Sequence, residues 1–77
     1  MNKQRRNRLQ KVIDKLEELS EELHDICSEE EDAYDNMPEG LQEAERGQLM
    51  YENIDEMSDM ECEMDDWVNR LQEIVDA

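Results

Sequence analysis

The sequence predicts an all-α protein, an antiparallel two-helix hairpin (coiled-coil-like) that dimerises into a four-helix bundle. Apolar residues recur at intervals of three and four in two long stretches, the spacing of helices that bury one face. One short segment of turn-forming residues, Asp35 to Gly40, separates the two stretches. A chain of 77 residues is long enough for one small domain, which we expect to span residues 1–77.

The first helix is expected over about residues 6–35 because its apolar residues form a sustained heptad. No Gly or Pro interrupts the chain between Leu16 and Tyr34, where good helix formers dominate. Beside the heptad, at position e, lie Ile13, Cys27 and Tyr34. The heptad itself has Leu9, Leu16, Leu23, Glu30 and Met37 at position a, and Val12, Leu19, Ile26 and Ala33 at position d.

The turn is expected over about residues 36–40. Pro38 has no N–H group and disfavours helical geometry at the residue before it, and Gly40 can adopt a positive φ angle. Asp35 or Asn36 could cap a helical turn that begins at Pro38.

The second helix is expected over about residues 41–75. Gly47 occupies an a position, which costs about 1 kcal/mol relative to Ala in a helix interior, and we interpret it as a close approach or a kink. Met60, Trp67 and Ile74, seven residues apart, widen the apolar face on one side. Because one hairpin covers only part of two such wide stripes, we expect a homodimer. The second heptad consists of Met50, Ile54, Met57, Glu61, Met64, Val68, Leu71 and Val75.

Charge is distributed very unevenly along the chain. After Lys15 there are 23 acidic and only two basic residues, a net charge of −21, whereas residues 1–15 carry +5. A hairpin about 45 Å long would then carry one carboxylate per ~2 Å, similar to the phosphate charge of duplex DNA at one per about 1.7 Å. This pattern predicts a basic protein partner and no direct binding of nucleic acid. The alternative is an acidic surface that only keeps the protein soluble.

The carboxylates expected to bind that partner lie on the outer faces of both helices. No single one should dominate, since electrostatic mimicry spreads the binding energy over many contacts. The residues are Glu17, Glu18, Glu21, Glu22, Asp25, Glu29 and Asp32 on the first helix, and Glu52, Asp55, Glu56, Asp59, Glu63, Asp65 and Asp66 on the second.

The basic segment, Lys3 to Lys15, opposes the dipole of the helix that it begins. We expect it to form ion pairs, within the hairpin or between subunits, with acidic residues near the end of the second helix. A nucleic-acid-binding arm is the alternative, although no motif supports it. The acidic residues are Asp65, Asp66, Glu73 and Asp76.

No arrangement of residues indicates an enzyme, a cofactor or a metal site. Glu21 and His24 have the Glu-x-x-His spacing used in di-iron bundles, but the heptad places both on the solvent side. Glu30 and Glu61 interrupt the apolar seam, either where it opens to solvent or where a polar residue sets the register. The sequence has no signal-peptide pattern and no apolar run long enough to cross a membrane, so we expect a cytoplasmic protein with no membrane partner.

One segment resembles a turn found in short acidic helical-hairpin proteins of bacteriophages and prophages, whose pattern is E-E-x-A-[YF]-D-N-[ML]-P-E-x-L-Q-x-x-E-R-G. The match covers about eighteen residues closely and the flanking helices only in pattern. The segment is Glu30-Glu31-Asp32-Ala33-Tyr34-Asp35-Asn36-Met37-Pro38-Glu39-Gly40-Leu41-Gln42-Glu43-Ala44-Glu45-Arg46-Gly47.

This resemblance implies the hairpin fold and a phage origin, with action inside the bacterial host cell. By analogy of class, small acidic phage proteins are often inhibitors of host nucleic-acid enzymes or defence systems, including anti-CRISPR proteins. We therefore expect a non-enzymatic inhibitor that acts as a DNA mimic on a basic nucleic-acid-binding surface of a host defence or DNA-processing protein. The alternative is a coiled-coil adaptor in phage morphogenesis that docks through the Met-rich face of its second helix.

Overall fold

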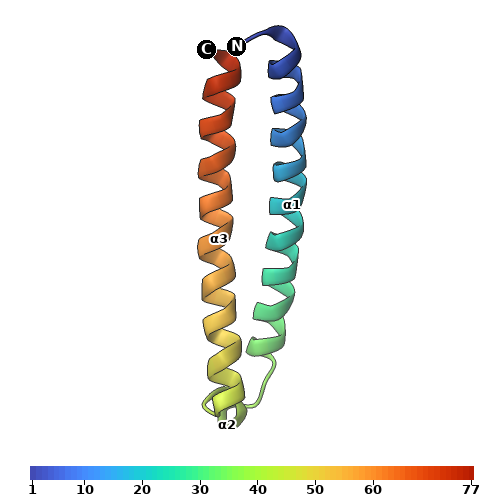
Figure 1. Cartoon of the computed structure of the whole chain (residues 1–77). Coiled ribbons are helices and arrows are strands. Elements are labelled where there is room, and N and C mark those ends of the chain that lie inside the picture. Colours follow the sequence, from blue (N-terminus) through green and yellow to red (C-terminus); the bar gives the residue numbers. More distant parts are fainter.

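The computed structural model of the chain consists of two long antiparallel helices joined by a compact corner (Figure 1). Helix α1 spans Lys3–Asp35, α2 spans Glu39–Gln42, and α3 spans Glu45–Asp76. The predicted all-α hairpin is thus confirmed. The molecule measures 58 × 14 × 13 Å, longer than expected because both long helices exceed thirty residues and α2 extends the corner. None of its helices is long and apolar enough to cross a membrane.

Helix α1 begins three residues earlier than expected, because Asn2 caps it. The Asn2 side-chain oxygen accepts a hydrogen bond from the Arg5 backbone N–H at 2.8 Å. Asn is among the strongest N-cap residues, since its side chain satisfies an N–H group that has no partner within the helix.

The corner corrects the predicted start of the second helix. Instead of one helix from about residue 41, the short α2 follows Pro38, and α3 begins only at Glu45. No side chain caps α2, so the expected capping by Asp35 or Asn36 is wrong, and Asn36 instead ends α1. Gln42 Nε2 donates to the Tyr34 carbonyl oxygen at 2.8 Å, which satisfies an acceptor at the end of α1.

At Gly47 the backbone of α3 lies close to the backbone of α2. Gly47 is buried, and a Cβ atom there would collide with the carbonyl oxygens of Leu41 and Gln42. The predicted close approach is therefore confirmed, although it joins α3 to α2 and not to α1. A side chain at residue 47 would push α2 away from the start of α3.

The seam between α1 and α3 has an unexpected register on α1. Ile13 and Cys27, at position e, are 0% and 3% exposed. The d-position residues Val12, Leu19 and Ile26 are about half exposed, so the predicted place of the d positions in the seam is wrong. The a positions are half-buried as predicted, and the seam of α1 therefore uses positions a and e. The physical reason is that α3 covers only the e flank of the α1 stripe. On α3 the predicted a/d face lies in the seam, with Ile54 buried and the other members half-buried.

We predict that Gly47→Ala lowers the free energy of unfolding by about 1–3 kcal/mol, because the new methyl group overpacks the corner. Gly40→Ala is the matched control, since nothing lies within 4 Å of a Cβ at that position. In the helical turn of α2 this control should be neutral or slightly stabilising. Urea unfolding followed by circular dichroism measures both variants, and equal stability of the two would contradict the packing described for Gly47.

Candidate protein-binding surfaces: carboxylate rows and an open apolar face

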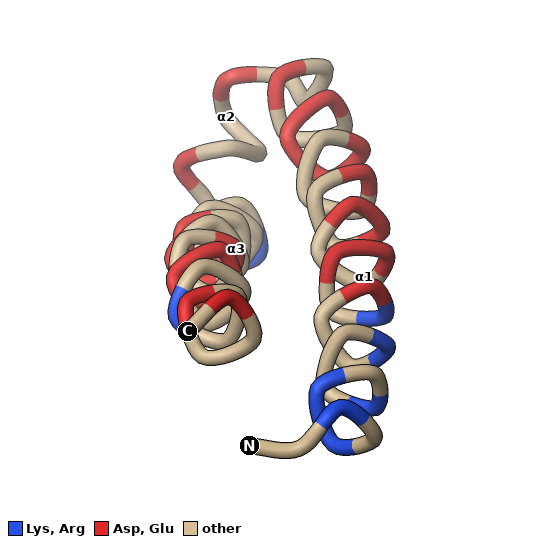
Figure 2. Tube along the Cα trace, turned by 90° about the horizontal axis from the view of Figure 1, so that it is seen from above, with Lys and Arg blue, Asp and Glu red and all other residues tan.

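All fourteen carboxylates predicted to bind a partner are exposed in the structure. They occupy the outer faces of α1 and α3, as expected, while their role in binding stays a prediction. Acidic residues follow both long helices beyond the basic first turns of α1 (Figure 2). The 23 carboxylates after Lys15 are spread over 58 Å, or one per about 2.5 Å, a density near that of duplex DNA.

Few of these carboxylates have partners within the hairpin. Asp66 pairs with Arg70 at 3.9 Å, where both side chains are about two-thirds exposed. Asp65 accepts a hydrogen bond from the Ser20 hydroxyl at 3.4 Å. An exposed ion pair of this kind contributes little to stability. The fourteen carboxylates, which we call the carboxylate rows, are therefore available to cationic groups of another molecule.

Glu61, one of the two carboxylates that interrupt the seam, has a partner across the helix pair. His24 Nδ1 lies 2.8 Å from Glu61 Oε1, and the Glu61 side chain is only 17% exposed. The expected solvent-side place of Glu21 and His24 is confirmed, since both are exposed. No three His, Cys, Asp or Glu side chains come close enough together to hold a metal ion. His24 thus acts as a polar link between α1 and α3.

The basic segment, Lys3 to Lys15, does not form the expected ion pairs within the hairpin. None of its Lys or Arg side chains lies within 4.0 Å of an Asp or Glu carboxylate. Arg6 donates instead to the Ala77 carbonyl oxygen at 2.9 Å, and the Gln10 and Gln72 amides bond to each other at 3.3 and 3.4 Å. The expectation of intramolecular pairing with the end of α3 is therefore wrong.

A second surface, which we call the open apolar face, runs along one side of the hairpin. Its residues are between 44% and 55% exposed. It consists of Val12, Leu19 and Ile26 on α1, and Met60, Trp67 and Ile74 on α3.

The two halves of this face lie on the same side of the molecule. Ala33 of α1 and Arg46 of α3 line one shallow hollow near the corner. Ala33 shares its heptad column with Val12, Leu19 and Ile26, and Arg46 shares its column with Met60, Trp67 and Ile74. Because residues seven apart lie on one face of a helix, both apolar columns border the same side of the seam.

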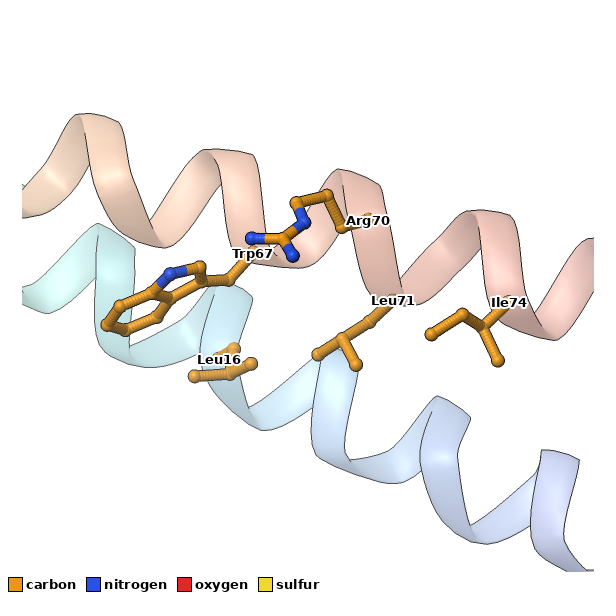
Figure 3. A pocket seen from close by; sticks show the side chains of 5 residues that line it. All are labelled: Leu16, Trp67, Arg70, Leu71 and Ile74. Atoms are coloured by element: carbon orange, nitrogen blue, oxygen red, sulfur yellow. The ribbon is translucent and has the colours of Figure 1, made fainter.

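A hollow lies beside Trp67 on this face (Figure 3). Trp67, Leu71 and Ile74 extend from α3, and Leu16 approaches them from α1, so the four side chains line a hollow with Arg70 at its edge. The apolar columns were visible in the sequence, but which of them the second helix would leave uncovered was not. That depends on the flank from which α3 approaches α1.

The two cysteines have opposite environments. Cys62 is exposed, whereas Cys27 is buried and its thiol donates to the Ile54 carbonyl oxygen at 3.6 Å. Burial, and then the carboxylates of Glu31 and Glu61, raise the pKa of the Cys27 thiol. Cys27 is consequently a core residue with little thiolate at neutral pH.

We predict that a thiol reagent such as Ellman's reagent modifies one thiol per chain rapidly at pH 8, because the thiolate is the reactive form and only Cys62 is accessible. Cys62→Ser should remove the rapid phase, and both thiols should react at similar rates in denaturant. Rapid reaction of the remaining thiol in folded Cys62→Ser would contradict the burial of Cys27.

Comparisons with protein-family models, with curated proteins and with solved structures give no match to this chain. The fold is therefore described from this structure alone. The resemblance of residues 30–47 to phage hairpin proteins stays a prediction.

Proposed function

We propose that this protein is a non-enzymatic inhibitor that occupies a basic nucleic-acid-binding surface of a host defence or DNA-processing protein, as a DNA mimic of phage origin. The observation that carries the proposal is the exposure of all fourteen predicted carboxylates along two rigid helices. Helices hold these charges in fixed rows, as a duplex holds its phosphates. A basic groove that binds such rows releases counterions, the process that drives much of DNA binding.

The small number of internal partners of these carboxylates supports this proposal. Only Asp66 among the fourteen carboxylates forms an ion pair within the hairpin, and that pair is long and exposed. A net charge of −16 also exceeds what solubility requires, a magnitude of about 2–8 for a small domain. So much like charge opposes the compact state, a cost that is understandable if the charge is used for binding.

A second function, that of an assembly adaptor in phage morphogenesis, is favoured by the open apolar face. An adaptor is expected to expose a contiguous apolar patch, and Trp67, Met60 and Ile74 are each close to half exposed. Under the inhibitor proposal this face is covered by a second copy, which completes a four-helix bundle. Binding through the apolar face would survive high salt, and binding through the carboxylate rows would not.

The decisive experiment is affinity capture of host proteins from a bacterial lysate on the immobilised full chain. We predict that nucleic-acid-binding proteins are retained at about 50 mM salt, are lost by about 200 mM, and are displaced by short duplex DNA. Capture that persists at high salt and resists DNA would support the adaptor function and contradict the inhibitor proposal.

Charge reversal gives the matched test for the captured protein. Glu18, Glu21 and Asp25 lie together on the outer face of α1, and their replacement by Lys should abolish binding while circular dichroism stays helical. The control reverses three exposed acids around α2 that lie outside the predicted rows, so the net charge changes equally: Glu39, Glu43 and Glu45. Equal loss of binding in both variants would mean that net charge, and not the rows, is recognised.

A further inference from the structure

We infer that the open apolar face is the interface of an antiparallel homodimer, in which the basic end of each hairpin lies against the corner end of a second copy. The inference rests on the proposed four-helix bundle and not on the proposed inhibition. It assigns the direction of pairing, the residues that meet across the interface and a role for the basic segment, Lys3 to Lys15.

The apolar column on α1 is symmetric about Leu19. Val12 precedes Leu19 by seven residues and Ile26 follows it by seven. If two copies of α1 pack antiparallel with Leu19 against Leu19, Val12 of one copy lies opposite Ile26 of the second. These side chains are 47%, 55% and 46% exposed in the single hairpin, so this pairing covers the surface that α3 leaves open.

The column on α3 has the same symmetry about Trp67, with Met60 seven residues before it and Ile74 seven after it. Trp67 and Leu19 lie at nearly the same level of the hairpin, because Ser20 bonds to Asp65 and Leu16 lines the hollow beside Trp67. One two-fold axis can therefore pair α1 with α1 and α3 with α3. Both apolar columns would be covered by the same contact.

The charges that border the apolar columns select this direction. One heptad column of α1 borders the d positions on the flank away from the seam. Its members, seven residues apart, are Arg8, Lys15, Glu22 and Glu29. Their sign changes at the level of Leu19. An antiparallel pairing about Leu19 places Lys15 opposite Glu22 and Arg8 opposite Glu29, and each contact occurs twice in the dimer.

The charged residues beside the apolar column of α3 also change sign along the helix. Glu63 precedes Trp67 and Arg70 follows it. An antiparallel pairing about Trp67 brings Glu63 of one copy to Arg70 of the other. With both corners at the same end, α1 would instead lie beside α3 of the second copy. That arrangement brings Lys15 near Arg70 and Glu22 near Glu63, so like charges would meet at both ends.

The thin core of the single hairpin agrees with this assignment. Only four of its 77 residues are buried, namely Ile13, Cys27, Gly47 and Ile54. A small scaffold with so little core usually gains stability from a second subunit. No Lys or Arg of the basic segment pairs with an Asp or Glu of its own chain. In the dimer, Arg8 and Lys15 of this segment meet Glu29 and Glu22 of the second copy.

Cross-linking of the purified full chain tests the direction of pairing. In a Cys62→Ser background, Arg8→Cys and Glu29→Cys chains are mixed and treated with a short bismaleimide. We expect cross-linked heterodimers of the two variants, with much less product from either variant alone. A dimer that cross-links no better in the mixture than in the separate variants would overturn the antiparallel arrangement.

Sedimentation equilibrium tests the interface itself, with a dimer of twice the 9.2 kDa chain as the expected result. Lys15→Glu should weaken dimerisation by about tenfold, because two attractions become repulsions, and Lys15→Glu with Glu22→Lys should restore it. Lys3→Glu, away from the face, controls for net charge.

Leu19→Asp should give a helical monomer, whereas Leu49→Asp, at the same 55% exposure, should stay dimeric.

A monomer at micromolar concentration, or no recovery in the double variant, would refute the interface. Neither measurement involves a host target. Failure of the dimer and failure of the inhibitor proposal are therefore distinguishable.

Discussion

The structure depends on a narrow apolar seam that holds together two strongly acidic helices. Residues 16–77 carry a net charge of −21, and the hairpin opposes this repulsion with only four buried residues and a half-buried stripe. The seam uses one flank of each apolar stripe, so the other flank stays exposed. The carboxylate rows and the open apolar face both follow from this geometry, since the charges point outward and the uncovered apolar columns border the seam.

The polarity of charge along the chain gives the hairpin a direction. Basic residues occupy the first turns of α1, and acidic residues dominate everything beyond them (Figure 2). Both ends of α1 bear charge of the wrong sign for its dipole, since neither acidic residues in the first turn nor basic residues in the last turn are present. A second hairpin in the opposite direction would bring compensating charge to both ends of α1. Of the fourteen outer carboxylates, only Glu22, Glu29 and Glu63 would then pair with basic residues of the second copy, and the others would stay free.

Much of the fold was predictable from the sequence, because heptad spacing determines which residues share a helix face. The two long helices and the exposure of the carboxylates followed from that spacing, and the corner followed from Pro38 and Gly40. The seam register on α1 did not, since Val12 and Ile13 are both apolar and only the approach of α3 makes Ile13 the buried one. A helical turn from Pro38 was anticipated, but its separation from the second long helix was not. At that break the backbone of α2 lies against Gly47 of α3, a contact between elements that no local sequence pattern predicts. Partner binding is not a property of one chain's geometry, so the carboxylate rows predict a class of target and no identity.

The most direct test of the account is the distance between two spin labels at residue 7 in the dimer, measured by pulsed electron paramagnetic resonance on Asn7→Cys in a Cys62→Ser background. Residue 7 lies twelve positions from Leu19 on the exposed side of α1. An antiparallel dimer centred on Leu19 separates the labels by about 36 Å along the bundle axis at 1.5 Å per residue. A distance within about 20 Å, the width of a bundle of helices about 10 Å across, would show that the basic ends lie together and would contradict the account.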